Sequence, residues 1–315
     1  MFGVALLTSW LLLDGGGGPA GECPDAAACP AAPAAALDAA SSAPDNGPPA
    51  VVDDTPPSLT AKSGVLIDEA CAAVLWEQAP HARLAPASLT KIATALVAVQ
   101  HSDPAQMVTV HVNGPALAVT TDGTIMGLVP GETLSMRDLL YGLLLPSGND
   151  AALAIAEYVA GSDDAFVELM NALVAQLGLT DTHFTNPHGL DDPGLYTSAY
   201  DIAMLGRELL RQPQLAEAVR ARVYEPAWSG PELWNVNRLI YQYPGALGIK
   251  TGYTDEAGHT IVAAAERNGR RLIAAVLGSS DAYLDATALL DWGFGATSSR
   301  CAPPIQAQAA PPAGG

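Results

Sequence analysis

The sequence predicts an α+β fold in which strands from the two ends of the folded region form one antiparallel sheet, with a mostly helical insertion between them. Short apolar runs bounded by glycine or acidic residues, which are typical of strands, occur at residues 63–75 and again at 260–277. Between these two regions, apolar residues recur at helical spacing. We therefore expect the first and last strands to pair.

The first strands form a hairpin. Its two apolar runs, at residues 64–67 and 71–75, are separated by Asp68 and Glu69, which mark the turn. Glycines flank the later runs and indicate where each one stops. The remaining strands and a closing helix are expected at residues 260–265, 271–277 and 285–294.

Helices fill the middle of the folded region. The strongest prediction is a buried helix at residues 88–100, where apolar residues and alanines recur at helical spacing. The candidate N-caps of the last two helices are Asp163 for one, and Thr197 or Ser198 for the other. Further helices are expected at residues 136–145, 150–159, 164–177 and 198–211.

The two ends of the chain differ in composition from the middle. Residues 2–13 are mostly apolar but fall short of the roughly 20 residues that span a bilayer. We expect residues 1–23 to be a signal peptide or an N-terminal membrane segment, although no Lys or Arg precedes the apolar run. Residues 24–57 are rich in Ala and Pro, so they are expected to be a disordered linker. The folded domain is expected at 58–295 and a disordered tail at 296–315.

The chain is strongly acidic, with a formal net charge of −19 at pH 7 and a pI near 4.4. Nucleic acids and anionic membrane surfaces need a basic face, so neither is an expected partner, and membrane contact is expected only through the N-terminus, if at all. The four cysteines, Cys23, Cys29, Cys71 and Cys301, have no zinc-ligand spacing. We expect Cys71 to be a small buried apolar residue, and a disulfide pairing cannot be deduced from the spacing.

Lysine is rare, and two of the three lysines lie in short motifs. Lys91 closes a Ser-x-x-Lys motif that begins at Ser88, and Lys250 opens a Lys-Thr-Gly motif. A Ser-Gly-Asn motif, Ser147 to Asn149, lies between them. The chain also has eleven arginines, but arginine stays protonated and cannot act as a base. Lysine at these places predicts an amine that loses its proton or acts as a compact charge.

Ser88 lies at the expected start of its helix, where the helix dipole is positive and backbone N–H groups lack intrahelical partners. Such a position suits a nucleophile and an oxyanion donor. Lys91, one turn later, lies on the same face and can reach the hydroxyl. Apolar surroundings and a neighbouring cation such as Lys250 lower the pKa of the Lys91 amine, so it can accept the Ser88 proton near neutral pH. By itself, however, the pattern also fits an ordinary helix start.

The other two motifs supply the remaining groups. The Ser-Gly-Asn tripeptide lies between two expected helices, where Ser147 can relay a proton to a leaving amine and Asn149 can hold the lysine base or a substrate carbonyl. The Lys-Thr-Gly motif is expected just before the late strands, and Gly252 there lets a substrate backbone approach closely. Thr251 can bond a terminal carboxylate, for which Lys250 supplies positive charge.

The order and spacing of the motifs carry more weight than any one of them. Ser-x-Asn follows Ser-x-x-Lys by about 60 residues, and Lys-Thr-Gly follows about 100 residues later, the order found in penicillin-binding proteins and β-lactamases. With these motifs the chain closely resembles the low-molecular-mass penicillin-binding proteins that act as serine-type D-alanyl-D-alanine carboxypeptidases. The matching segments are PASLTKIAT (86–94), LPSGNDAA (145–152), HFTNPHGL (183–190), NVNRL (235–239), GIKTGYTDEAG (248–258) and LDWGF (290–294).

The resemblance implies a β-lactamase/transpeptidase-like fold and an extracytoplasmic hydrolase of the cell envelope. Its substrate would be the peptidoglycan stem peptide, with β-lactam antibiotics as covalent inhibitors, roles in cell-wall biogenesis and cell shape, and no metal or organic cofactor. Backbone N–H groups of Ser88 and Tyr253 would form the oxyanion hole. The implied roles are Ser88 as acyl-ester nucleophile, Lys91 as proton acceptor, Ser147 as second active serine, Asn149 as its motif partner, and Lys250, Thr251, Gly252 and Tyr253 as substrate-binding residues.

One departure and several alternatives remain. Some relatives bind the substrate carboxylate with an arginine after the last long strand, but residues 278–284 contain no basic residue, so Thr251 and Lys250 carry more of this task. A β-lactamase of class A has Glu-x-x-x-Asn about 35 residues after the second motif. The nearest candidate here, Glu168 to Asn171, comes too early and is one residue too short for this element, so it is expected to be part of an ordinary helix. A D,D-endopeptidase and a catalytically silent penicillin-binding sensor stay open. The six histidines form no His-Glu-x-x-His zinc motif.

Overall fold

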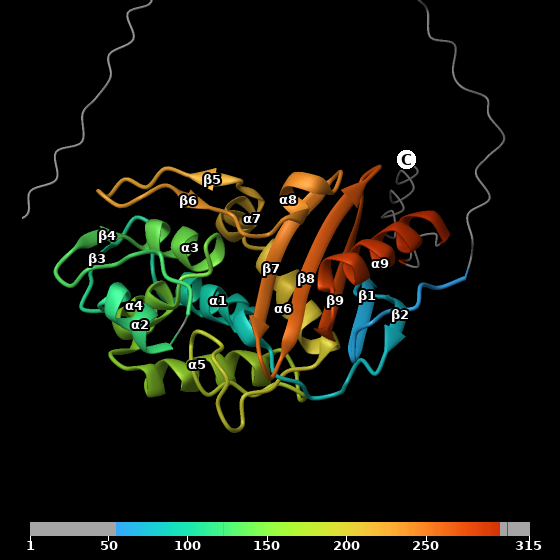
Figure 1. Cartoon of the computed structure of the whole chain (residues 1–315), viewed down its shortest axis with the longest axis horizontal. Coiled ribbons are helices and arrows are strands. Elements are labelled where there is room, and N and C mark those ends of the chain that lie inside the picture. The colour runs from blue at the N-terminus through green and yellow to red at the C-terminus, as the bar shows by residue number, and fades with distance from the viewer. Residues whose placement is uncertain (1–54, 122, 297–300, 302–315) are drawn as a thin grey trace, which may run out of the picture. The chain divides into compact units, whose positions relative to one another are not determined.

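A five-stranded antiparallel sheet forms the centre of the computed structural model, which describes residues 55–121, 123–296 and 301 (Figure 1). The strands are β1 (Ser63–Asp68), β2 (Val74–Gln78), β7 (Ala246–Thr254), β8 (Gly258–Arg267) and β9 (Arg270–Ser279). Their spatial order is β2-β1-β9-β8-β7, and every neighbouring pair is antiparallel. Strand β1 pairs with β9, which confirms the expected pairing of the two ends of the folded region.

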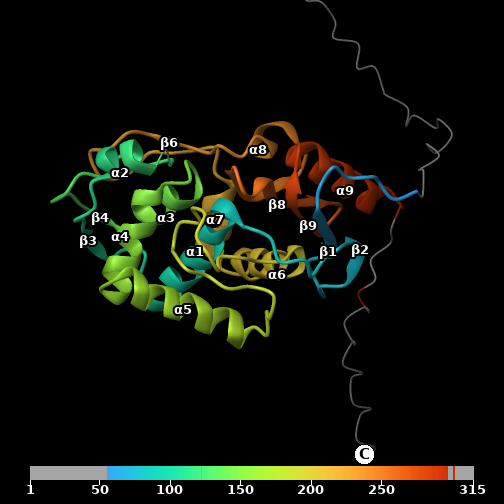
Figure 2. The same cartoon turned by 60° about the horizontal axis from the view of Figure 1, so that its bottom comes forward.

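The sheet is covered by helices on both faces, because its central strands are apolar on both sides. In β1, Val65 and Ile67 point into one core and Leu66 into the other. Helix α9 (Ala282–Ala296) packs on one face, and α6 (Ala199–Leu210) and α1 (Lys91–His101) lie on the other (Figures 1 and 2). Strand β7, at one edge of the sheet, packs against α7 (Pro213–Arg220) and against the short helix η1 (Ala87–Thr90).

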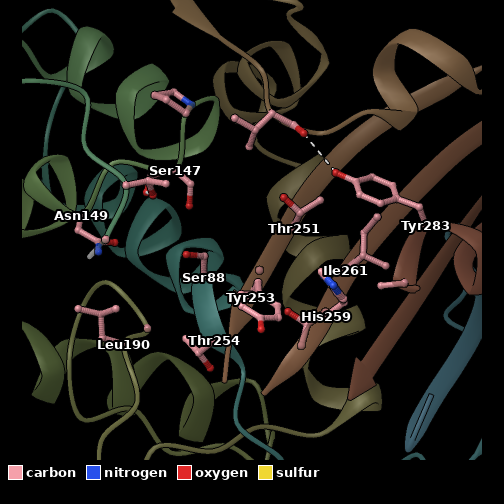
Figure 3. Close-up of a pocket in the computed structure, with 18 residues that line it drawn as sticks. Ser88, Ser147, Asn149, Leu190, Thr251, Tyr253, Thr254, His259, Ile261 and Tyr283 are labelled. Carbon is pink, nitrogen blue, oxygen red and sulfur yellow. Dashed lines mark hydrogen bonds between the residues drawn. The ribbon is translucent and has the colours of Figure 1, made fainter. Parts of the chain in front are cut away.

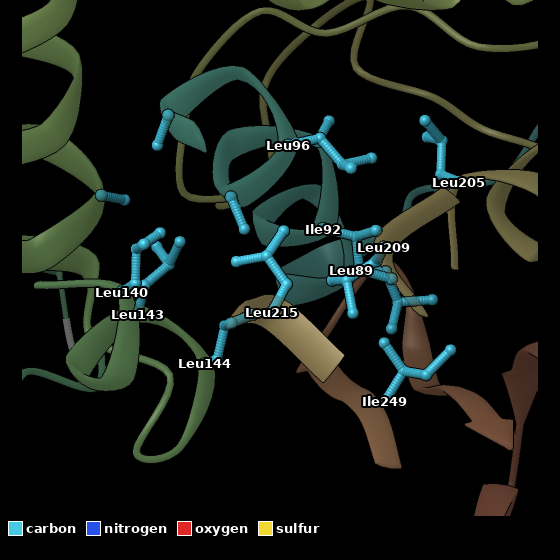
Figure 4. Close-up of a cluster of buried hydrophobic side chains, with 14 of the residues drawn as sticks. Leu89, Ile92, Leu96, Leu140, Leu143, Leu144, Leu205, Leu209, Leu215 and Ile249 are labelled. Atoms are coloured by element: carbon cyan, nitrogen blue, oxygen red, sulfur yellow. The ribbon is translucent and has the colours of Figure 1, made fainter. Parts of the chain in front are cut away.

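Helix α1 runs through the middle of the helical region, and its residues 91–98 are all buried. Leu89, Ile92 and Leu96 lie among leucines of the surrounding helices (Figure 4). A helix that is apolar on every side is expected in the core of a larger domain. The surrounding helices are α3 (Met136–Leu144), α4 (Asn149–Ala160), α5 (Asp163–Gln176), α6 and α7 (Pro213–Arg220).

The expected long helices are present, with small differences at their ends. The first begins as a short 3-10 helix, η1 (Ala87–Thr90), before α1. Asp163 was wrong as a cap, because the Ser162 hydroxyl accepts from the Ala165 N–H at 3.2 Å, whereas Ser198 does cap α6. A hydroxyl one residue earlier reaches the open N–H groups of the first turn.

The Lys-Thr-Gly motif lies within strand β7 and not before the strands, which corrects its expected position.

Other elements escaped prediction because they are short. The elements without a sequence prediction are α2 (Gly114–Thr121), the hairpin β3 (Met107–Thr109) with β4 (Thr133–Ser135), the hairpin β5 (Val223–Tyr224) with β6 (Leu233–Trp234), α7 and α8 (Leu239–Gln242).

Cys71 forms a disulfide with Cys301, with their Cα atoms 5.6 Å apart. The prediction of a buried, unpaired Cys71 was therefore wrong, since this residue is exposed in the β1–β2 turn. Cys301 belongs to the expected tail, so part of that tail is attached to the folded domain. The expected N-terminal segment and nearly all of the linker lie outside the described residues. Within the described residues, no helix combines the length and apolarity needed to cross a membrane.

Candidate active site

The three motifs meet at one cavity of about 400 Å³ (Figure 3). Helix η1 brings Ser88, the loop between α3 and α4 brings Ser147, and strand β7 brings Thr251. The residues that line the cavity are Ser88, Gly123, Thr124, Pro146, Ser147, Asn149, Gly189, Leu190, Val236, Thr251, Gly252, Tyr253, Thr254, His259, Thr260, Ile261, Ala282 and Tyr283. Lys91 and Lys250 are buried behind this surface.

Lys91 is the centre of the hydrogen-bond network. Its Nζ lies 2.9 Å from the Ser88 Oγ, on the same turn of chain. It also lies 2.7 Å from the Asn149 Oδ1 and 2.6 Å from the main-chain oxygen of His188. Three segments far apart in the sequence thus converge on one amine.

The types of these three contacts are compatible with a neutral Lys91 amine. The Asn149 Oδ1 and the His188 carbonyl oxygen can only accept hydrogen bonds. A neutral amine has two N–H donors and one lone pair, so when Lys91 donates to both of these oxygens its lone pair is left for the Ser88 hydroxyl. This geometry allows Lys91 to accept the Ser88 proton.

The surroundings of the lysines favour a neutral Lys91. Burial lowers its pKa well below the ordinary value, and the nearby Lys250 lowers it further, while Asp150 raises it. Burial lowers the pKa of Lys250 to about 7. Burial and the neighbouring Lys91 lower the pKa of His188 to about 4, so its ring is neutral near neutral pH.

Ser147 carries a hydroxyl with no partner in the described part of the chain. Its Oγ is buried and makes no hydrogen bond, although the residue lines the cavity. Its φ of 69° lies in the left-handed region, which is strained for a serine. An unpaired buried hydroxyl costs free energy, and a bound substrate can supply the missing partner.

Strand β7 passes directly against Ser88. A Cβ added at Gly252 would lie 2.8 Å from the Ser88 N and 2.6 Å from the Thr260 Oγ1, so only glycine allows this approach. The close approach places the backbone of β7 beside the Ser88 N–H. Thr251, Tyr253 and Thr254 from the same strand line the cavity.

Some residues of the site had no assigned role in the sequence. The His188 carbonyl contacts Lys91, and Gly189 (φ +89°) approaches Ala87 so closely that a Cβ would collide with its carbonyl. The segment 183–190 was noted as a match, but a backbone carbonyl carries no residue-type pattern that reveals its function. Of the predicted site residues, all eight lie at the cavity or directly behind it.

The fold is that of the penicillin-binding DD-peptidases. The DD-transpeptidase of Streptomyces K15 superposes with a TM-score of 0.73 at 28% identity, over 76% of this chain and 99% of that one. Penicillin binding protein 6B from Escherichia coli gives a TM-score of 0.71 at 37% identity, over 76% of this chain and 79% of that one.

The sequence comparison identifies the family. The D-alanyl-D-alanine carboxypeptidase family, peptidase S11, matches residues 50–281. The D-alanyl-D-alanine carboxypeptidase DacF of Bacillus subtilis is 38% identical over 245 residues, which are 74% of this chain and 62% of that protein. The chain belongs to the D-alanyl-D-alanine carboxypeptidase family, and it spans 62 to 64% of the length of the curated relatives that it matches first.

Proposed function

We propose that this chain is a serine-type D-alanyl-D-alanine carboxypeptidase that removes the terminal D-alanine from peptidoglycan stem peptides. The observation that carries the proposal is the position of Lys91, whose Nζ contacts the Ser88 Oγ while two acceptor oxygens hold its other hydrogens. Membership of the D-alanyl-D-alanine carboxypeptidase family names the reaction class. Metal and organic cofactors play no part in this mechanism.

The first step is acylation. Lys91 takes the proton of the Ser88 hydroxyl, and the Oγ attacks the carbonyl of the penultimate D-alanine. The N–H groups of Ser88 and Tyr253 stabilise the oxyanion that forms. The C–N bond then breaks, the leaving D-alanine takes a proton that Lys91 passes on through the Ser147 hydroxyl, and the peptide remains as an ester on Ser88.

The second step is hydrolysis of the ester. Water attacks the acyl carbonyl and gives a proton to Lys91, and Lys91 passes a proton to the Ser88 Oγ as the C–O bond breaks.

Before acylation, the terminal carboxylate of the substrate is bound by the Thr251 hydroxyl and by the positive charge of Lys250. The pKa of Lys250, near 7, means that this charge is partly lost around neutral pH.

A second candidate function is transfer of the acyl group to an amine acceptor, because the Streptomyces K15 neighbour is called a DD-transpeptidase. A β-lactamase is less well supported, because no Asp or Glu is among the described residues that line the cavity. Glu168 and Asn171 lie on α5, and Asn171 bonds the backbone of Phe184 instead. An endopeptidase differs only in the position of the bond, and a silent sensor would not release D-alanine.

We place the enzyme outside the cytoplasm, in the cell envelope or secreted. Disulfides persist in oxidising compartments and are rare in the cytosol. The Cys71–Cys301 disulfide therefore supports an extracytoplasmic location, where peptidoglycan stem peptides are found.

The test uses the full chain, with Ser88→Ala beside it. The protein is incubated with benzylpenicillin and its intact mass is followed over time, and D-alanine release is then measured from diacetyl-Lys-D-Ala-D-Ala with and without an added amine acceptor. We expect a long-lived adduct that Ser88→Ala lacks, together with free D-alanine. Rapid penicillin turnover without D-alanine release indicates a β-lactamase, an adduct without D-alanine release indicates a sensor, and no adduct at all rejects Ser88 as the nucleophile.

A further inference from the structure

Asp150, the residue after the Ser-Gly-Asn motif, is a fully buried carboxylate that the mechanism above does not use. Its Oδ1 accepts from the N–H groups of Met126 at 2.8 Å and Ala151 at 2.9 Å. Its Oδ2 accepts from Gly127 and Leu128, both at 2.9 Å. A carboxylate has about four acceptor positions, so all of them are occupied by backbone. Three of these bonds hold residues 126–128, which precede Asp150 by 22 to 24 residues.

The segment that Asp150 holds lies against the motif. The Thr124 hydroxyl donates to the Ser147 carbonyl at 2.7 Å, and the Thr124 carbonyl accepts from the Asn149 N–H at 2.8 Å. Gly123 packs so closely on the Asn149 side chain that a Cβ would collide with its Nδ2. The strained Ser147 backbone and the Asn149 side chain are therefore braced from one side by residues 123–128.

We propose that Asp150 is a positioning residue: by binding the backbone of residues 126–128, it keeps Thr124 against the Ser-Gly-Asn loop and so fixes the Asn149 side chain that contacts Lys91. The inference rests on the proposed acyl-transfer function of this site. A displacement of catalytic groups by about 1 Å can lower a rate 100-fold, so such a brace matters for the reaction.

The charge of Asp150 acts on the same lysine. Lys91 faces Lys250 from β7, Asp150 from α4 and His188 from the loop 183–190. The negative charge of Asp150 raises the pKa of Lys91, whereas burial and Lys250 lower it. His188 is neutral near neutral pH because its pKa is about 4. Loss of the Asp150 charge therefore lowers the pKa of Lys91 further.

A purely structural role gives a different expectation. Asp150 is the second residue of α4, and an acidic residue in the first turn of a helix stabilises it through the helix dipole. A residue that did only this would change the stability of the protein and leave the acylation rate and its pH dependence unchanged. These two readouts separate the roles.

The experiment compares full-length wild type with Asp150→Asn, measuring the rate of acylation by benzylpenicillin from about pH 4 to about pH 9. Asparagine has one acceptor oxygen and an amide that cannot accept, so some backbone N–H groups lose their partner. We expect the maximal rate to fall at least about tenfold. We also expect the acid limb of the pH profile to move to lower pH, because Lys91 then loses its proton more easily.

Asp138→Asn is the matched control. Asp138 is also a buried carboxylate, 1% exposed, and it accepts from the backbone N–H groups of Ser135 and Ala227, but it does not line the cavity. Its removal is expected to lower the stability and to leave the rate and the acid limb unchanged.

Thr124→Val is the second variant, in case Asp150→Asn does not fold. It keeps the Asp150 charge and removes the hydroxyl that bonds Ser147. The acylation rate is expected to fall several-fold while the acid limb stays in place.

The outcomes are separable. If benzylpenicillin does not acylate the wild type, the proposed function itself is rejected, and this inference falls with it. An acylated wild type with a slower Asp150→Asn and a shifted acid limb supports the inference. A rate within about threefold of wild type, or an unmoved limb, overturns it, and so does a Thr124→Val variant that acylates at the wild-type rate.

Discussion

The cavity has a helical wall, formed by η1, α1 and the loop between α3 and α4, and a sheet wall, formed by strand β7. The two walls differ in how completely the amines of their lysines are paired. On the helical wall, the Lys91 amine contacts three oxygens at 2.6 to 2.9 Å. Two of them, the Asn149 Oδ1 and the His188 carbonyl oxygen, can only accept hydrogen bonds. On the sheet wall, the Lys250 amine donates, within the described residues, to one partner, the carbonyl of Thr251. Strand β7 is also an edge strand of the sheet. The contacts of the Lys91 amine are therefore in place before substrate arrives, although the Ser147 hydroxyl on the same wall has no partner among the described residues, whereas the Lys250 amine has a single one.

This difference suggests a division of labour. A base must already be oriented and neutral when the substrate binds, and preorganised groups need no rearrangement during the reaction. A wall that binds substrate differs from this, because its hydrogen-bond donors gain partners only when the substrate is bound. Changes on the helical wall should therefore lower the rate of chemistry, whereas changes on the sheet wall should weaken substrate binding.

The largest effect is expected for Lys91→Arg. Arginine keeps the positive charge but cannot accept a proton, so the rate of acylation by benzylpenicillin should fall by about 10²- to 10⁴-fold. Stopped-flow or intact-mass measurements give this rate. Lys62→Arg, at an exposed lysine outside the cavity, is the matched control and should acylate normally. A Lys91→Arg variant that acylates within tenfold of wild type would break the assignment of the base.

Thr251→Val should have the next largest effect, on binding. Valine has nearly the same shape as threonine but no hydroxyl, so one hydrogen bond to the substrate carboxylate is lost. A hydrogen bond to a charged group contributes about 1.5 to 3 kcal/mol, and KM for the diacetyl peptide should rise at least about tenfold with little change in kcat. Thr251→Ser, which keeps the hydroxyl, should restore KM. A fall in kcat alone would place Thr251 with the chemistry instead.

The pH dependence of binding should show a smaller effect. The pKa of Lys250 is lowered from its ordinary value to about 7, so its positive charge is present below pH 7 and is lost as the pH rises. KM for the peptide should therefore increase several-fold across this range. Lys250→Arg stays charged and should give a flat profile, provided that its thermal unfolding shows a folded protein. Inhibition by the C-terminal amide of the peptide, which lacks the carboxylate, should not depend on this titration.

The Cys71→Ser, Cys301→Ser double variant should leave the chemistry unchanged. The disulfide joins residues 230 apart and neither cysteine lines the cavity. Its loss should lower the free energy of unfolding by about 2 to 5 kcal/mol, as measured by denaturant titration. The acylation rate at a temperature where the variant is folded should equal that of wild type. A slower variant would show that the β1–β2 turn affects the acylation rate, although it belongs to neither wall of the cavity.

The sequence predicted the long elements well because their patterns are local. Residues 88–100, 136–145 and 164–177 carry helical periodicity over nearly three turns or more, and each corresponds to a helix in the structure. Short pieces such as α8 (Leu239–Gln242) have too few residues for a period to emerge. Strand β7 was missed because its glycines and polar residues, Lys250 to Gly252 among them, hide the alternation of a strand.

By itself, the sequence determined the three motifs, their order, the family they belong to and the chemistry that lysine, serine and threonine side chains can perform. Only the tertiary structure decided which groups meet. Asn149 reaches Lys91 across 58 residues of chain, and the His188 carbonyl across 97. The brace of Asp150 and the Cys71–Cys301 pairing likewise depend on contacts between distant segments. A side chain's chemistry is written at its own position, but its surroundings, and hence the pKa of Lys91 and the partners of Asp150, are set by the packing of the whole chain.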